Sequence, residues 1–134
     1  MKYYRFLFLT IFLFSAHAYA FQEKLEVVEQ FDNLRMVAFI RIKDISNSPA
    51  WNPDAELPPL SVGEAVKAVK KFDKSPKTDG KIQEIEIRQV PGHENRWHYL
   101  VKVSNEAMKS KMSVYVVLMN GKVIPAIIEP EGYK

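Results

Sequence analysis

The stretch SVGEAVKAVKKF, residues 61–72, predicts an amphipathic helix and points to the fold class. The hydroxyl of Ser61 can accept a hydrogen bond from an amide of the first turn, while Glu64 reaches back to the Ser61 amide, as in a capping box. At about 100° per residue, one side of this helix is apolar. That stripe comprises Val62, Ala65, Val66, Val69 and Phe72. The helix should therefore lie on an apolar surface, and we expect it to end near residues 73–75, because Pro76 disfavours helix in the residue before it.

Downstream of the helix the sequence has the pattern of an antiparallel sheet. Strands are predicted near residues 84–90, 97–103, 113–119 and 122–128. The second of these alternates cleanly, with Trp97, Tyr99, Val101 and Val103 on one face. Asn120-Gly121 separates the last two strands and suits a two-residue type I′ turn, in which both positions need positive φ. Pro125 cannot donate to a ladder, so the last strand is expected at an edge.

Upstream of the helix the pattern is less regular. Residues 35–43 alternate as a half-buried strand does, and the four prolines within residues 48–60 indicate an extended connector. Residues 23–31 fit a helical stripe or a strand, and we favour a helical turn or a mobile arm. Together these elements predict an α+β fold, in which one amphipathic helix packs on an antiparallel sheet of about four to five strands.

The first twenty residues have the three parts of a secretory signal peptide. A basic start is followed by an apolar run at 6–14 and by Ala18-Tyr19-Ala20, so cleavage is expected before Phe21. The apolar run is too short to span a bilayer, and no transmembrane segment is expected in the mature chain. The protein is therefore expected to be exported, to the periplasm or beyond. The domain organisation is a leader at 1–20, an arm, strand and connector at 21–60, and a helix-plus-sheet unit at 61–134, which forms one domain with residues 33–60.

Composition excludes several classes of protein. The 134 residues contain no cysteine, which rules out disulfides, a thioether lipid anchor and a cysteine nucleophile. The formal net charge is +3, and the leader itself carries two cations, Lys2 and Arg5, without any acid. This weak balance gives no support for nucleic-acid binding.

No pattern of catalytic residues is recognisable. His93 and His98 mimic the zincin motif but stand five apart, whereas zinc ligation by H-E-x-x-H requires a spacing of four on a helix. No serine lies in a G-x-S-x-G turn, and Glu84 and Glu86 share one strand face in the manner of solvent-facing residues. We therefore expect no catalytic residue, no metal site and no cofactor, and the chain is interpreted as a protein that is not an enzyme.

The order of elements over roughly residues 60–128 resembles that of PepSY-like domains. The resemblance rests on LSVGEAVKAV (60–69), IQEIEIRQV (82–90), RWHYLVKV (96–103) and VYVVLMNGKVIPAI (114–127). It implies a helix packed on an antiparallel sheet, of cystatin-like shape, in a module that binds or modulates other proteins outside the cytoplasm, with protease modulation in some members. Where many members carry an Asp and a Thr-Gly before the final strand, this chain has Leu118, Met119 and Asn120-Gly121.

The hairpin at Asn120-Gly121 indicates where a partner would bind. A two-residue turn gives the hairpin two apolar faces, one of them with Tyr115, Val117, Met119 and Ile124. The helix can cover only one face, and Tyr99, Val101, Val114, Val116 and Leu118 are the expected sheet side of that core. The N-terminal arm, another subunit or a client protein would cover the other. Tyr115, Val117, Met119 and Ile124 are therefore the candidate partner-binding residues.

The lysines of the helix form a second candidate site. Lys67, Lys70, Lys71 and Lys74 lie opposite the apolar stripe. They are either the solvated side of an amphipathic helix or a surface for an anionic partner, such as lipid headgroups or a wall polymer. Two functions follow: a protein-binding module, or an envelope-surface protein that binds anions. Steep salt dependence of binding would distinguish the second from the first.

Overall fold

The computed structural model describes residues 24–31, 33–74 and 80–129, so the predicted leader and cleavage site lie outside the described residues. Within these described residues, two helices and seven strands follow one another. They are β1 (Lys24–Phe31), β2 (Leu34–Arg41), α1 (Ile42–Asn47), α2 (Val62–Phe72), β3 (Ile82–Gln89), β4 (Trp97–Ser104), β5 (Met112–Leu118), β6 (Val123–Pro125) and β7 (Ile127–Ile128).

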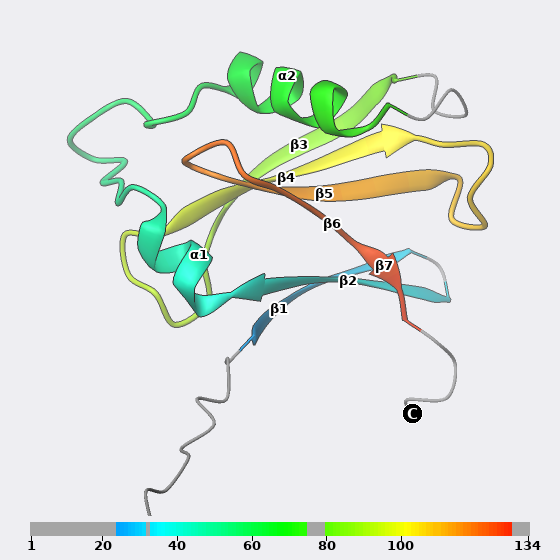
Figure 1. Ribbon diagram of the computed structural model, residues 1–134, viewed down its shortest axis with the longest axis horizontal. Coiled ribbons are helices and arrows are strands. Elements are labelled where there is room, and N and C mark those ends of the chain that lie inside the picture. The colour runs from blue at the N-terminus through cyan, green and yellow to red at the C-terminus, as the bar shows by residue number, and fades with distance from the viewer. Residues whose placement is uncertain (1–23, 32, 75–79, 130–134) are drawn as a thin grey trace, which may run out of the picture.

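The elements form three layers (Figure 1). A central sheet has the strand order β3-β4-β5-β6, and helix α2 lies across one of its faces. An N-terminal sheet with the order β1-β2-β7 packs against the other face. All pairings are antiparallel. The expected α+β class, a helix on an antiparallel sheet, is confirmed, whereas the second sheet was not expected.

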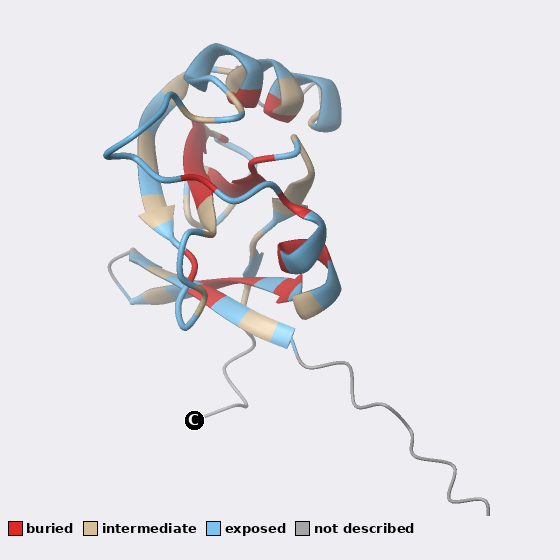
Figure 2. Ribbon diagram, turned by 90° about the vertical axis from the view of Figure 1, so that its left-hand side faces the viewer, coloured by how far each residue is buried: buried red, intermediate tan, exposed pale blue. Residues whose placement is uncertain are grey.

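The two inner strands of the central sheet, β4 and β5, are buried on both faces (Figure 2). Beneath α2, Tyr99, Val101 and Val117 pack with Ala65 and Val69 of the helix. On the other face a second core holds side chains from both sheets, namely Met36, Ala38, Ile40, Leu100, Val114, Val116 and Leu118. The core set expected under the helix is thus divided: Tyr99 and Val101 lie there, while Val114, Val116 and Leu118 face the N-terminal sheet.

The N-terminal residues form a strand and not the helical turn or mobile arm that we favoured. β1 pairs with β2 in a hairpin in which Leu25 lies opposite Ile40 and Val27 opposite Ala38. These four side chains point into the second core. Their alternation is that of a strand because a strand presents every second residue to the same side. β1 and β2 therefore supply the second cover that the hydrophobic pattern required.

Helix α2 follows the sequence prediction closely. The Ser61 hydroxyl accepts from the Glu64 amide, and the Glu64 carboxylate accepts from the Ser61 amide, which completes the capping box. Ala65 and Val69 are fully buried, but the exposed fractions of Val62 and Phe72 are 46% and 51%. The apolar stripe of α2 is therefore larger than its contact with the central sheet, and its first and last residues remain partly exposed to solvent. The proline-rich residues 48–60 contain neither helix nor strand, as predicted.

The short helix α1 connects the layers. β2 was predicted to continue to Lys43, but the chain enters α1 at Ile42, and Ile45 is buried in the second core. Asp44 holds this corner: its carboxylate accepts from the Arg41 guanidinium at 2.9 and 3.1 Å and lies 2.8 Å from the Lys122 ammonium. Lys122 belongs to the β5–β6 connection, so Asp44 joins α1 to the central sheet.

We predict that Asp44→Asn lowers the free energy of unfolding in a pH-dependent way. Hydrogen bonds from Arg41 and then Lys122 lower the pKa of Asp44 to about 2. The charged form is therefore more stable in the folded state, and its contribution is complete above the unfolded pKa and is lost as pH falls through about 2. Urea melts should show a difference from the unmodified chain of about 1–2 kcal/mol at pH 7 that shrinks below about pH 4. The exposed Asp54→Asn is the control, and an equal difference at all pH values would contradict the assignment.

Candidate interaction surfaces

The four residues predicted to bind a partner are not a surface. Tyr115, Val117 and Met119 are buried beneath α2, with exposed fractions of 6%, 0% and 2%. The Tyr115 hydroxyl donates to the Asp73 carboxylate at 2.7 Å, and burial together with this bond raises the pKa of Tyr115 to about 12. Ile124 lies on the other side of the sheet, half-buried against the second core. The prediction of a partner-binding face made of these residues is therefore wrong.

The β5–β6 turn explains why Ile124 separates from the other three. Leu118 donates to the Lys122 carbonyl at 2.9 Å, and Gly121 donates to the Leu118 carbonyl at 2.8 Å. The loop thus has three residues, with positive φ at Gly121 (87°) but not at Asn120. This is the geometry of a type I turn followed by a G1 bulge, not of the predicted type I′ turn. The extra residue places Ile124 opposite Val116 and moves it to the other face. Pro125 lies in the edge strand β6, as predicted.

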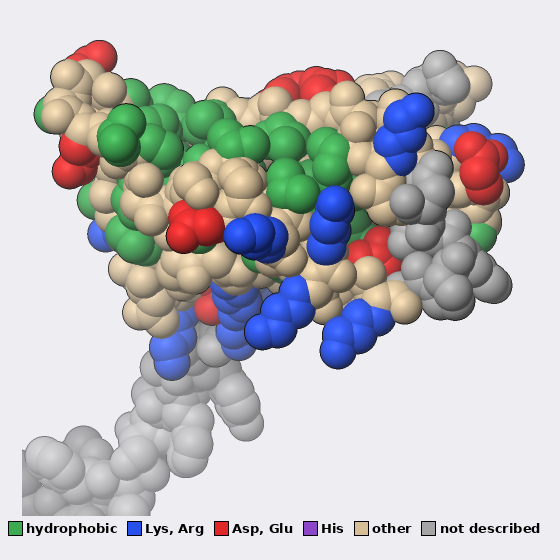
Figure 3. Space-filling model, turned by 90° about the horizontal axis from the view of Figure 1, so that it is seen from above, with side chains coloured by type: hydrophobic (Ala, Val, Ile, Leu, Met, Phe, Trp, Pro, Cys, Tyr) green, Lys and Arg blue, Asp and Glu red, His purple; other side chains and the backbone are tan. Residues whose placement is uncertain are grey.

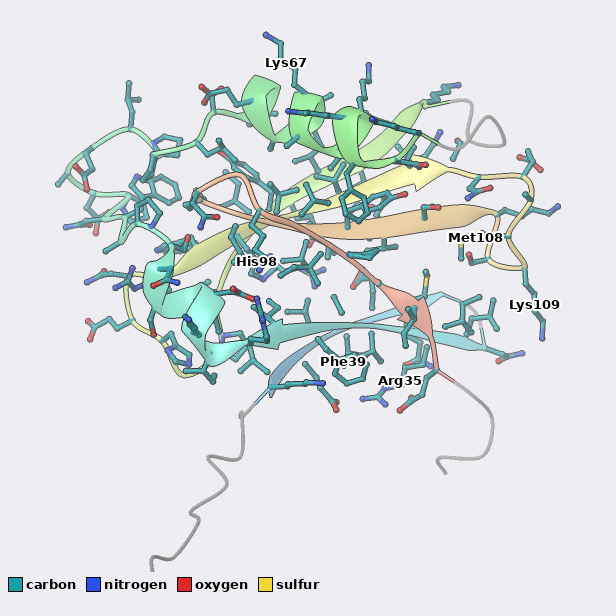
Figure 4. All side chains as sticks on the ribbon, viewed as in Figure 1. Arg35, Phe39, Lys67, His98, Met108 and Lys109 are labelled. Carbon is teal, nitrogen blue, oxygen red and sulfur yellow. The ribbon has the colours of Figure 1, made fainter. Side chains whose placement is uncertain are left out.

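The four lysines predicted as a candidate anion-binding surface lie on the outside of the protein. Lys67, Lys70, Lys71 and Lys74 are all exposed. Lys67 points away from the body of the protein (Figure 4), and a band of hydrophobic side chains adjoins lysines on this side of the molecule (Figure 3). None of the four forms an ion pair with a carboxylate in the described parts of the chain.

An ion cluster between the two sheets was not predicted. Lys102 of β4, whose side chain is 7% exposed, places its ammonium 2.9 Å from Glu29 of β1 and 3.1 Å from Glu84 of β3. Arg88 contacts Glu29 at 3.0 Å and Glu86 at 2.6 Å. These five residues are called the inter-sheet ion cluster below. Its signal in the sequence is Lys102 between two valines of β4, at the cross-strand position of Glu84. Glu84 and Glu86 thus face the N-terminal sheet and its partner charges.

Neither the two described histidines, His93 and His98, nor the tryptophans form a recognisable ligand site. His93 lies in the β3–β4 connection, while His98 is buried in β4, and burial lowers its pKa. Among residues 24–31, 33–74 and 80–129, no group of three or more His, Cys, Asp or Glu side chains is placed to hold a metal ion. Trp51 and Trp97 pack edge to face with ring centroids 5.4 Å apart, and the Trp51 indole donates to the Glu56 carbonyl.

The outer face of the N-terminal sheet carries an apolar patch. Val37 of β2 is buried at its centre and lies opposite Val28 of β1 and Ile127 of β7. Around it the exposed fractions are 36% for Val28, 42% for Phe39 and 52% for Ile127. Phe39 points away from the central sheet (Figure 4). We call Val28, Val37, Phe39 and Ile127 the outer patch; contiguous exposed apolar side chains of this kind often mark an interaction site.

Charges of both signs border the outer patch. Arg35 lies 3.7 Å from Glu26 and forms an ion pair with Glu129. Sequence reasoning missed this surface because β1 was not recognised as a strand, so the side chains of β1, β2 and β7 could not be placed on a common face.

The chain matches no protein-family model, and searches of curated proteins and of solved structures return no significant match. In the described part of the chain, no helix has both the length and the hydrophobicity needed to cross a membrane.

Proposed function

We propose that this protein is an exported, non-enzymatic, PepSY-like module that binds another protein through the outer patch. The observation that carries the proposal is the exposure of Val28, Phe39 and Ile127 around the buried Val37, on the sheet face turned away from the core. Further support comes from residues 60–128, where a helix followed by an antiparallel sheet is the arrangement expected of PepSY-like domains.

The border of the patch indicates the chemistry of its partner. Arg35, Glu26 and Glu129 place cations and anions together at the rim, so this face is not suited to a uniformly anionic membrane or polymer. An apolar centre with a mixed polar rim is the composition of protein–protein interfaces. The partner is therefore a folded protein that presents apolar side chains within a rim of complementary charges.

We predict that Phe39→Lys abolishes partner capture without unfolding the protein. Because Phe39 is 42% exposed, the substitution leaves the core intact but places an unpaired charge at the contact. Used as bait on an extract of the native cell envelope, the unmodified chain should retain a partner that is lost at least about tenfold with Phe39→Lys. Circular-dichroism melts of both proteins should coincide.

A matched substitution controls for charge itself. Lys67→Glu changes a residue of α2, which lies in a different layer from the outer patch. It should leave capture of the partner unchanged. Equal retention of the partner by the Phe39→Lys bait and by the unmodified chain would overturn the proposed function.

The lysine surface supports a second candidate function, the binding of anionic lipid or polymer. Its specific observation is the exposure of Lys67, Lys70, Lys71 and Lys74 without ion pairs to described carboxylates. Vesicles containing an anionic phospholipid would test it. Binding that weakens steeply with salt and is lost with Lys70→Glu would favour this function, whereas capture that is indifferent to salt and depends on Phe39 favours the outer patch.

A further inference from the structure

Strand β3 is an edge strand of the central sheet in the described part of the chain. Among the residues that the structure describes it pairs with β4 alone, and its eight residues, IQEIEIRQ, contain neither proline nor lysine. The opposite edge of the same sheet is protected, because β6 has three residues and ends at Pro125. Natural proteins usually shorten, bend or charge an exposed edge, since its free amide and carbonyl groups can pair with another strand. The charged residues of β3 face the N-terminal sheet, and its register with β4 shifts between Ile82 and Glu84. From Glu84 to Gln89 the pairing with β4 is regular, so this stretch can accept a further strand.

The side chains of β3 that face α2 are incompletely covered. Helix α2 lies mainly over β4, β5 and β6. Ile87 remains 42% exposed and Val62, at the start of the helix, 46% exposed. A hydrophobic band is visible from this side of the molecule (Figure 3). A strand added to β3 would therefore extend the sheet and also cover apolar surface.

The sequence of β3 is complementary to itself when it is read antiparallel about Ile87. In that register Ile87 lies opposite Ile87 of a second copy, and Glu86 lies opposite Arg88 at both ends of the pairing. Shifting the centre to Glu86 would place two Glu86 carboxylates opposite each other, and centring on Ile85 would place Glu84 opposite Glu86. Of these three registers, only the one centred on Ile87 has two opposite-charge pairs and no like-charge pair.

We propose that two copies of this chain associate through β3, antiparallel and centred on Ile87, to form one continuous eight-stranded sheet. The contact is isologous, with a two-fold axis through the paired Ile87 residues and perpendicular to the sheet. Both α2 helices then lie on one face of the sheet, and both N-terminal sheets lie on the other. Identical strands satisfy the charge pattern, whereas a strand of another protein would need the same order of charges.

Light scattering coupled to size exclusion tests the dimer directly. Protein expressed as the full chain and purified in soluble form should show a concentration-dependent dimer. Ile87→Lys, which places two ammonium groups opposite each other at the axis, should raise the dissociation constant at least about tenfold. Ile127→Lys, at an apolar position of similar exposure in the outer patch, should leave it unchanged.

Cross-linking tests the register. The chain has no cysteine, so Ile87→Cys introduces a single thiol, and opposed residues have Cβ atoms about 4.5–5.5 Å apart, close enough for a disulfide after small adjustment. Oxidised glutathione should convert Ile87→Cys to a covalent dimer faster than it converts Glu86→Cys or Ile127→Cys. A monomer at every concentration, or a rate for Ile87→Cys no greater than for the other two, would overturn the proposal. Because Phe39→Lys and Ile87→Lys alter different sheets, loss of partner capture and loss of self-association are distinguishable.

Discussion

Val69→Asp should unfold the protein. Val69 is a residue of α2 that is 1% exposed and packs into the core that includes Tyr99 and Val101. A carboxylate at that position would be buried without a partner, at a cost of several kcal/mol, which is comparable with the whole stability of a small domain. In a circular-dichroism melt we expect loss of the cooperative transition, or a large fall in its midpoint.

The neighbouring residue provides a matched control. Lys70→Glu also introduces a carboxylate into α2, but on its exposed side, so the free energy of unfolding should change by no more than about 0.5 kcal/mol. Equal shifts in the two variants would mean that the buried and exposed faces of α2 are assigned wrongly. Val66 is only half-buried, and Val66→Asp should therefore destabilise the protein less than Val69→Asp.

Lys102→Ala should be the second most disruptive substitution. It removes from the inter-sheet ion cluster the ammonium that contacts Glu29 and Glu84, and leaves those carboxylates with less compensation between the sheets. Breaking a buried ion pair by removing one partner costs about 3–5 kcal/mol. Urea unfolding, followed by circular dichroism, should show a decrease of this order.

The direction of the pKa shift at Lys102 sets the pH range of this effect. Burial lowers the pKa of Lys102. The hydrogen bonds with Glu29 and Glu84 raise it by more than burial lowers it, so the net shift of the pKa is upward. The charge-dependent stability is therefore complete at neutral pH and is lost as pH rises through the raised pKa. Lys109, which points into solvent (Figure 4), supplies the control. A Lys102→Ala protein as stable as Lys109→Ala would show that the cluster contributes nothing.

The helix and most strands could be predicted from the sequence because their signals are local. The capping box at Ser61 and Glu64, the alternation through β4 and the position of Pro125 each depend on residues a few places apart. The β5–β6 turn was the exception. Asn120-Gly121 is compatible with a two-residue turn, but Met119 is buried in the core under α2, and the loop includes it as a third residue. Packing of a distant element therefore determined the register.

The two candidate surfaces differ in how far apart in the sequence their residues are. The exposure of Lys67, Lys70 and Lys71 followed from helical periodicity alone. The outer patch instead requires that β7, which is far from β1 and β2 in sequence, join them in one sheet.

By itself, the sequence determined the helix, its buried and exposed faces, the α+β class and the need for two covers on a sheet with two apolar faces. The tertiary structure alone decided what provides the second cover, and therefore which side chains remain outside. Both faces of the β5–β6 hairpin are similarly apolar, so hydrophobicity could not distinguish the face under α2 from the face under β1 and β2. The difference is set by contacts such as Glu29 with Lys102, between residues whose proximity exists only after the two sheets have packed.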